Sequence, residues 1–363
     1  MTENYYCVIM AGGVGSRFWP LSRMNKPKQF LDILGTGKTL IQQTFERFEN
    51  ICPTENIYIV TSTEYKELVQ KQLPQLNEKQ ILLEPYRKNT APCIAYAAYT
   101  IKKINPEAIL IVAPSDHIIL KNDEFTKDIK IGLDFISKDN NMLTLGIKPS
   151  RPETGYGYIQ FNKSQLENNP EGLVKVKTFT EKPNYELAKI FFETGEFYWN
   201  SGIFIWSVNT ILKAFEEFLP DINALFKEAY DKIGTNEEEE AIKNVYLNCK
   251  NISVDFGIME KAQNVYVLCS DFGWSDLGTW GSLYEHSVKD NNSNAIHGNN
   301  VFTYNTNNCI ITVPKDKLVV VEGLDNYIIA ESDNILLICN KKDEQEIRQI
   351  VNDIKIAKGE DYI

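Results

Sequence analysis

The residues best suited to chemistry stand in AGGVGSRFWPLSRMNKPKQF, positions 11–30. Gly12, Gly13 and Gly15 directly follow an apolar run, and Ser16, Arg17 and Lys28 come after them. Glycine allows positive φ and close backbone approach, so successive N–H groups can point at phosphate oxygens while the two cations neutralise charge. A plain glycine turn is the alternative, but the cations favour a phosphate-binding turn.

Two familiar nucleotide motifs are not supported. A dinucleotide-binding fingerprint needs a third glycine where Phe18 stands, and Pro20 blocks an immediate helix. The sequence GTGKT at 35–39 resembles the end of a P-loop, but Asp32 occupies the position of the first glycine. We therefore interpret 35–38 as a turn before a helix that begins near Thr39.

Two acidic residues far apart in the chain are candidate magnesium ligands. Asp116 follows the apolar run AILIVAP, and Asp276 lies in DFGWSDLGTW. Mg²⁺ takes oxygen ligands and usually only one or two protein carboxylates besides phosphates and water. Each acid taken alone is equally typical of a helix cap, so the hypothesis depends on the two acids acting together.

Further polar side chains are suited to a nucleoside and a sugar. In EPYRKNTAP, Glu84, Asn89 and Thr90 offer hydrogen-bonding groups for a base edge or a ribose, although Thr90 could equally cap the following helix. TGYGYI, FTEKP and WNSG combine tight turns with Glu181, Lys182 and Asn200, a set suited to sugar hydroxyls and one phosphate.

The elements that must position these residues follow an α/β pattern. Strands are predicted at 5–10, 57–61, 81–84, 108–114 and 142–147, and helices at 39–50, 64–73, 91–104 and 123–137. This alternation predicts a mainly parallel sheet with crossover helices. Ligands of such sheets bind at the carboxyl ends of the strands, where the glycine turn, Glu84 and Asp116 stand.

The remaining chain departs from this alternation. Residues 155–206 predict antiparallel strands added to the edge of the sheet, with one helix between them, and 208–262 are helical. After an Asn-rich stretch, five short β-rich segments and a helix at 343–356 predict a small C-terminal unit. We expect a catalytic domain at 1–289 and a small β-rich domain at 290–363.

Composition excludes several classes of protein. With 363 residues, 43% of them hydrophobic, the chain can bury a large core. No apolar run reaches the roughly 18 residues of a membrane span, and the N-terminus has no basic region of a signal peptide. The seven dispersed cysteines indicate reduced thiols and a cytoplasmic protein. The net charge of −11 argues against nucleic acid as a partner, so an anionic ligand must be held locally.

The ordered set of motifs resembles one enzyme family. GGVGSRFWPLSRMNKPKQF, EPYRKNTAP, PSDH, TGYGYI, FTEKP, WNSG, DFGIMEKA and DFGWSDLGTW together look like the mannose-1-phosphate guanylyltransferases. The resemblance is dense over residues 5 to 285 and loose beyond. It implies a sugar nucleotidyltransferase fold and the conversion of GTP and α-D-mannose 1-phosphate to GDP-mannose and diphosphate.

The resemblance also implies roles for individual residues. The glycine turn with Arg17 and Lys28 would hold the triphosphate, and Asp116 with Asp276 would bind Mg²⁺. The nucleoside would be bound by Glu84, Asn89 and Thr90, and the sugar phosphate by Tyr156, Gly157, Glu181, Lys182 and Asn200. The tail is similar to a left-handed β-helix that makes dimer contacts in shorter relatives, so we expect a homodimer. The family's additional isomerase barrel is not expected here.

Three rival functions remain at this point. Another base or sugar, such as UTP or dTTP with glucose 1-phosphate, would use the same chemistry. A regulatory subunit that binds a nucleotide sugar has no need to keep Arg17, Lys28, Asp116 and Asp276. A glycosyltransferase would be expected to carry a D-x-D metal pair on one loop, and none follows the central strands.

Overall fold

The computed structural model describes residues 4–167, 169 and 171–363; residues 1–3, at the start of the N-terminus considered above, lie outside the described residues. The chain forms two compact units. Unit 1 comprises Met1–Gly12, Thr44–Ser115 and Ile119–Trp274, and unit 2 comprises Gly13–Gln43, Asp116–Ile118 and Ser275–Ile363. The domain boundary expected near residue 290 stays a prediction.

Unit 1 is built on a nine-stranded mixed sheet with the strand order β3-β2-β1-β4-β9-β6-β10-β8-β7. The strands are β1 (Tyr5–Met10), β2 (Ile57–Ser62), β3 (Ile81–Glu84), β4 (Ile109–Pro114), β6 (Met142–Ile147), β7 (Gly157–Phe161), β8 (Leu173–Glu181), β9 (Phe197–Ser207) and β10 (Val265–Ser270). β1 pairs in parallel with β2 and β4, and β2 with β3. The predicted α/β architecture with inserted antiparallel strands is therefore confirmed.

The position of β9 differs from the expected one. β9 lies between β4 and β6 and is antiparallel to both, so only β7 and β8 extend the sheet at its edge. Phe204, Ile205 and Trp206 are all buried, which requires cover on both faces and suits a central strand. The parallel strand β10 was not predicted, because its six residues directly follow a long helical region.

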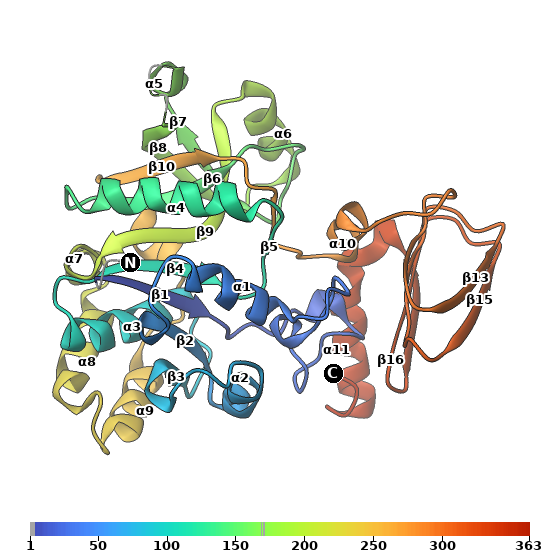
Figure 1. Cartoon of the computed structure of the whole chain (residues 1–363), viewed down its shortest axis with the longest axis horizontal. Helices are drawn as coiled ribbons and strands as arrows, with labels where there is room; N and C mark the ends of the chain where they lie inside the picture. The colour runs from blue at the N-terminus through green and yellow to red at the C-terminus, as the bar shows by residue number, and fades with distance from the viewer. Residues whose placement is uncertain (1–3, 168, 170) are drawn as a thin grey trace. The chain divides into compact units, whose positions relative to one another are not determined.

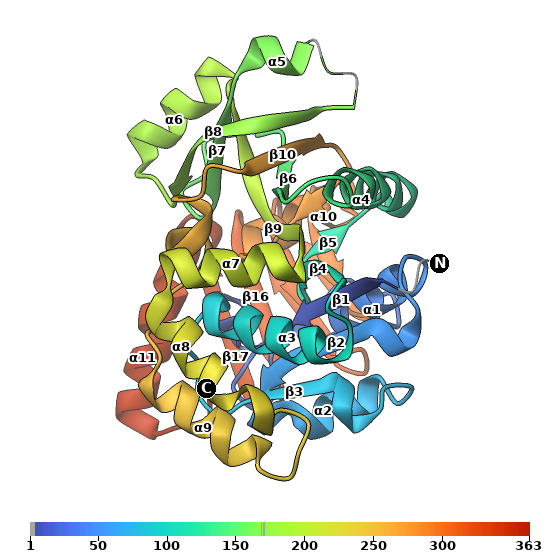
Figure 2. The same ribbon diagram turned by 90° about the vertical axis from the view of Figure 1, so that its left-hand side faces the viewer.

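Helices cover both faces of this sheet (Figures 1 and 2). In and around unit 1 they are α1 (Leu40–Glu49), α2 (Lys66–Gln72), α3 (Thr90–Ile104), α4 (Asn122–Ile136), α5 (Lys163–Glu167), α6 (Tyr185–Thr194), α7 (Val208–Phe218), α8 (Pro220–Ala229) and α9 (Glu238–Asn248). α3, α7 and α8 pack against one another. The helices predicted from residue 39 to 137 are confirmed to within two residues at each end.

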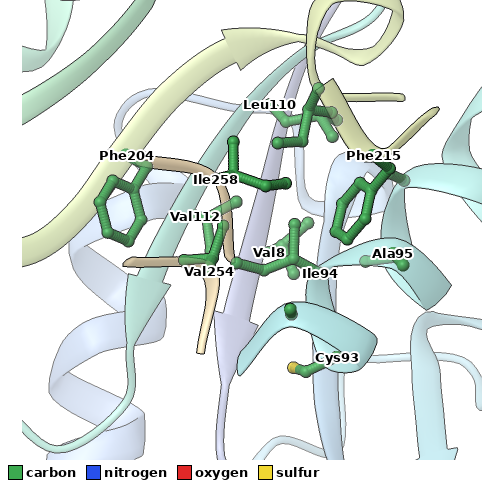
Figure 3. Packing of buried hydrophobic residues seen from close by; sticks show 14 of the residues in the cluster. Val8, Cys93, Ile94, Ala95, Leu110, Val112, Phe204, Phe215, Val254 and Ile258 are labelled. Atoms are coloured by element: carbon green, nitrogen blue, oxygen red, sulfur yellow. The ribbon is translucent and has the colours of Figure 1, made fainter. Parts of the chain in front are cut away.

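The main core of unit 1 lies between the sheet and α3 with α7. Val8, Leu110, Val112 and Phe204 point from the strands toward Ile94, Phe215 and Ile258, and all seven side chains are buried (Figure 3). Strand side chains alternate between faces, and Gly132 of α4 lies against Ile205, the neighbour of Phe204. The sheet is therefore packed on both sides, which makes its strand ends a rigid base.

Unit 2 contains a small coil of strands (Figure 1). Successive strands β12 (Ala295–His297), β13 (Asn300–Tyr304), β14 (Ile310–Thr312), β15 (Leu318–Glu322) and β16 (Tyr327–Ser332) alternate between two parallel sheets, and β17 (Ile335–Asn340) adds an antiparallel strand. The helices are α10 (Trp280–His286) and α11 (Ile347–Lys358). The two-residue strands β5 (Ile118–Ile119) and β11 (Trp274–Ser275) stand where the chain changes unit.

Unit 2 also holds the segment of the glycine turn. Phe18, Trp280, Ile310, Ile328 and Ile347 are buried in one apolar cluster. This cluster joins residues near both ends of the sequence, so the glycine turn folds together with the C-terminal coil. Across the described ranges, none of the helices is both long enough and apolar enough to cross a membrane.

Candidate active site

The glycine turn is held by its carbonyl groups. The backbone oxygen of Gly13 accepts from the Gln29 side chain at 2.9 Å, and that of Gly15 from the N–H of Phe18 at 2.9 Å. The oxygen of Val14 accepts from the N–H of Lys28 at 3.1 Å and from the hydroxyl of Ser22. The carbonyls of Gly13, Val14 and Gly15 are therefore all engaged by the protein.

The N–H groups of the same turn are not engaged. From Gly13 to Arg17, no backbone N–H donates to an acceptor in the described part of the chain. Short runs of unpaired N–H groups in a turn form a concave anion site. The turn thus has acceptors that are used internally and N–H groups that are unpaired, and its predicted binding of phosphate stays a prediction.

Gly15 is required by the backbone geometry. Its φ is 76°, and a Cβ atom added to it would stand 2.5 Å from the Cβ of Lys28. A side chain at this position would be strained in φ and would collide with Lys28. Glycine therefore permits the close contact between the turn and Lys28.

Lys28 is the centre of the site in unit 2. It is 4% exposed, and its Nζ lies 2.8 Å from Oδ2 of Asp116. Nζ also donates to the backbone oxygens of Asp276 at 2.8 Å and Leu277 at 3.1 Å. The two acidic residues predicted as metal ligands are 160 positions apart in sequence. One ammonium group contacts both of them, Asp116 at its carboxylate and Asp276 at its backbone oxygen.

The charge of Asp116 is stabilised by its neighbours. Burial is the largest influence and would raise the pKa of this carboxyl, but the charge and hydrogen bond of Lys28, the charge of His117 and a backbone hydrogen bond together outweigh it, so the pKa lies below its usual value. Oδ1 of Asp276 accepts from the N–H of Gly278 at 2.9 Å, which fixes the orientation of the second carboxylate. Both groups are suited to bind a cation.

Arg17 is the second cation of the turn. It lies in the short 3₁₀ helix Ser16–Phe18, and its guanidinium donates to the backbone oxygen of Gly278 at 3.5 Å. This long contact leaves most of the five donors of the guanidinium unused in the part of the chain that the structure describes.

The residues predicted to bind a nucleoside lie in unit 1. Glu84 ends β3, is 6% exposed, and accepts a hydrogen bond at Oε1 from the hydroxyl of Tyr246 at 2.8 Å. Its other oxygen faces Gly12, where an added Cβ would stand 3.3 Å from Oε2. Burial raises the pKa of Glu84 to about 7, although the Tyr246 hydrogen bond and the charge of Arg87 oppose the shift.

Asn89 and Thr90 start α3. The helix N-cap is Asn89, whose side chain accepts from the N–H of Thr90 at 2.9 Å, so Thr90 is the first helical residue rather than the cap. The hydroxyl of Thr90 accepts from the N–H of Val254 at 2.9 Å. Both side chains therefore make hydrogen bonds within the protein, and their contact with a nucleoside stays a prediction.

The residues predicted to bind a sugar phosphate are brought together by β7, β8 and β9. Gly157 pairs with Glu181, and an added Cβ on Gly157 would stand 2.6 Å from Oε2 of Glu181. Lys182 donates to the Glu181 carboxylate. Tyr156 packs edge-on against Trp199, the residue before Asn200.

Two residues of this site were missed by sequence reasoning. Asp255 accepts at Oδ1 from the Asn200 amide at 2.8 Å, and burial with the charge of Glu181 raises the pKa of Asp255 to about 6. Asp255 lies in the motif DFGIMEKA, which could have drawn attention to it. Tyr246, the partner of Glu84, had no signal, because a tyrosine in a helix is usually only a core residue.

Comparison with known families identifies the class of protein. The family described as "Nucleotidyl transferase" matches residues 6–293, and "MannoseP isomerase/GMP-like beta-helix domain" matches residues 298–354. The chain therefore belongs to the nucleotidyl transferase family and is an enzyme of this kind, and curated relatives at 34% identity over nearly its full length are mannose-1-phosphate guanylyltransferases.

These relatives match nearly the whole chain. A mannose-1-phosphate guanylyltransferase of Klebsiella pneumoniae is 34% identical over 98% of this chain and 75% of its own length. The alginate biosynthesis protein AlgA of Pseudomonas syringae is 35% identical over 95% of this chain and 70% of its own. A crystal structure described as mannose-1-phosphate geranyltransferase from Thermus thermophilus is 29% identical, covers 97% of this chain and 99% of its own, and has a TM-score of 0.86.

Nucleotidyl transferases of this family generally use a divalent metal ion. Over the described residues, no cluster of three or more His, Cys, Asp or Glu side chains could hold a metal by itself. A pair of carboxylates is nevertheless sufficient for Mg²⁺, which completes its shell with phosphate and water oxygens. Asp116 supplies one such carboxylate beside Lys28, and Asp276, whose backbone oxygen accepts from the same Lys28 ammonium, supplies the second.

Proposed function

We propose that this chain transfers GMP from GTP to α-D-mannose 1-phosphate and releases GDP-mannose and diphosphate. The observation that carries the proposal is the glycine turn whose N–H groups are unpaired, adjoining a lysine that contacts the Asp116 carboxylate and the backbone oxygen of Asp276. These groups suit a reaction in which two polyanions must be neutralised. The mannose and guanine preference is supported by the names of two relatives, both called mannose-1-phosphate guanylyltransferase.

The nucleophile needs no general base. A phosphate monoester has a second pKa near 6, so its oxygen is ionised at neutral pH. This oxygen attacks the α-phosphorus of GTP, the new P–O bond forms, and the bond to the β-phosphate oxygen breaks as diphosphate leaves. Catalysis must then come from positioning and charge stabilisation.

The site in unit 2 is assigned to the phosphates. The N–H groups of Gly13, Gly15 and Ser16 and the guanidinium of Arg17 bind the triphosphate and take up charge on the departing diphosphate. Lys28 holds Asp116 and the turn at Asp276 in place. Asp116 and Asp276 would hold Mg²⁺, which would supply positive charge to offset the repulsion of the reacting phosphates.

The residues in unit 1 are assigned to the base and the sugar. An ionised Glu84 can accept from N1–H and the N2 amino group of guanine, two adjacent donors that other bases lack. Asn89 and Thr90 are assigned to the nucleoside as well. Tyr156, Gly157, Glu181 and Asn200 surround the sugar, and Lys182 binds its phosphate.

The test is diphosphate release from four nucleoside triphosphates and several sugar 1-phosphates, with and without EDTA. We expect GTP with mannose 1-phosphate to be the best pair and EDTA to abolish turnover. Asp276→Asn should lower kcat about 10²- to 10³-fold, as expected for loss of one preorganised electrostatic contact. Asp271→Asn, which removes an exposed acid from the same motif, is the matched control.

Other outcomes of this panel would replace the proposal. A preference for UTP or dTTP with glucose 1-phosphate would indicate a related transferase. Binding of a nucleotide sugar without turnover would indicate a regulatory subunit. Asp276→Asn with normal kcat in magnesium would contradict the metal assignment.

We further propose a cytoplasmic homodimer without nucleic-acid partners, with a catalytic domain at 1–289 and a β-rich domain at 290–363. The cytoplasmic assignment is supported by the cysteines, all seven of which are free thiols. The domain division is supported by the separate family matches on either side of residues 294–297.

A further inference from the structure

The segment of the glycine turn is strongly basic in an acidic chain. Residues 13–43 carry five cationic side chains and one acidic one, whereas the whole chain has a net charge of −11. Arg23 is paired with Asp333, and Lys28 with Asp116. Arg17 has no carboxylate within ion-pair distance in the described residues, so its charge is left for a ligand.

The C-terminal helix α11 packs against this segment within unit 2 (Figure 1). Ile347, at the start of α11, is buried in the apolar cluster that contains Phe18. Past the end of α11, the backbone oxygen of Tyr362 accepts from the indole of Trp19 at 2.7 Å, and that of Ile363 from the N–H of Met24 at 3.2 Å. Contacts at both ends hold the helix along residues 18–24.

This packing brings a second arginine to Arg17. Arg348 follows the buried Ile347, its side chain is exposed, and it makes no ion pair or side-chain hydrogen bond with the described residues. Partial burial and the nearby positive charge of Arg17 lower the pKa of Arg348. Two unpaired guanidinium groups repel each other, and a bound polyanion removes this repulsion.

We infer that Arg348 binds, together with Arg17, the β- and γ-phosphates of GTP, which leave as diphosphate. The inference rests on the proposed function and adds a residue to it from outside the nucleotidyl transferase motifs. Guanidinium groups bind phosphate oxygens in a bidentate manner, and the unpaired N–H groups of the neighbouring turn offer further donors. The C-terminal helix then contributes directly to the triphosphate site.

The experiment compares Arg348→Gln with the wild type by calorimetric binding of GTP, inorganic diphosphate and GDP-mannose to the full chain. Loss of one charge-assisted contact should weaken GTP and diphosphate about 10- to 100-fold. GDP-mannose lacks the departing phosphates, so its affinity should change less than twofold. Arg348→Lys should recover part of the affinity for diphosphate, because the charge remains.

Lys355→Gln is the matched control, since it removes one positive charge from the same helix at a residue paired with Glu360. It should bind all three ligands as the wild type does. Equal diphosphate affinity in wild type and Arg348→Gln would overturn the inference alone. Equal weakening of all three ligands would also overturn it, because it would indicate a structural role. A wild type that binds neither GTP nor diphosphate would overturn the proposed function as well.

Discussion

Replacing Lys28 by methionine tests how the site in unit 2 is held together. Methionine has nearly the length of lysine but no charge and no donor. The change removes the ion pair to Asp116 and both hydrogen bonds to the backbone oxygens of Asp276 and Leu277. Three groups that converge on one nitrogen thereby lose their common partner.

The cost follows from burial. Removing one partner of a buried ion pair typically costs about 3–5 kcal/mol, because the other charge stays uncompensated. Asp116 is 30% exposed, so water screens part of its charge and lowers this figure. The two carbonyls each lose a donor, which adds a smaller cost. We expect Lys28→Met to lower the free energy of unfolding by about 3 kcal/mol at pH 7.

The effect should depend on pH with a defined sign. The folded state depresses the pKa of Asp116, because Lys28, His117 and a backbone hydrogen bond together outweigh burial, which acts in the opposite direction. A depressed carboxyl pKa stabilises the fold above the unfolded pKa, near 3.9, and this stabilisation is lost as pH falls. The difference between wild type and Lys28→Met should therefore be largest at neutral pH and should shrink below about pH 4.

Urea unfolding of four proteins measures this: wild type, Lys28→Met, Asp116→Asn and the double variant. A coupling free energy of about 2 kcal/mol at pH 7 is expected between the two positions. Lys26→Met is the matched control, because Lys26 is exposed two residues away and should leave the unfolding free energy within about 0.5 kcal/mol. Additive single effects, or a difference that does not change with pH, would refute the role given to Lys28.

Three further predictions follow from the pKa values and the glycine turn. The pKa of Glu84 near 7 predicts that KM for GTP rises as pH falls from 8 to 6. Tyr246→Phe removes a hydrogen bond to the ionised carboxylate and should move this pH profile of KM to higher pH. A profile that is the same in the variant and the wild type would contradict the proposed contact between Glu84 and the nucleoside. The pKa of Asp255 near 6 is raised by burial and by the charge of Glu181, so wild-type stability falls as pH rises through 6. Asp255→Asn should gain about 2 kcal/mol over wild type in urea unfolding at pH 7, after allowance for partial exposure, and no gain at pH 4. Gly15→Ala should lower the unfolding free energy by about 2 kcal/mol or more, because of its positive φ and the collision with Lys28. Gly13→Ala is the control and should change the unfolding free energy little, because an added Cβ there meets open space. Equal effects of the two substitutions would refute the strain at Gly15.

The strands that could be predicted from sequence are those with continuous apolar runs. β1 and β3 match their predicted ranges, because buried parallel strands leave a strong local pattern. The central place of β9 could not be predicted, since its pairing with β4 and β6 depends on partners that are distant in sequence. Local hydrophobicity indicates that a strand exists but does not identify its neighbours.

The same limit applies to the candidate site. Sequence reasoning selected Lys28, Asp116 and Asp276 for their chemistry, but only the fold shows that one ammonium contacts both acidic residues. Arg348 had no sequence signal at all, because an arginine on an amphipathic helix is most often a solvated residue. Residues that act through tertiary proximity are recognised only when the packing is known.

The arrangement of unit 2 explains why its C-terminal coil bears on the chemistry. The coil belongs to the same apolar cluster as Phe18 and Trp280, which flank the glycine turn and the segment of Asp276 in sequence. The N–H of Gly281 donates to Glu344 at 2.7 Å, and the indole of Trp19 donates to Tyr362 at 2.7 Å. Under the proposed function, an acidic chain binds a triphosphate and has to concentrate its donors and cations locally. The apolar cluster and these contacts hold the glycine turn and the segment of Asp276 against the C-terminal part of unit 2. Substitutions in the coil that loosen the cluster should therefore weaken the binding of GTP more than that of GDP-mannose.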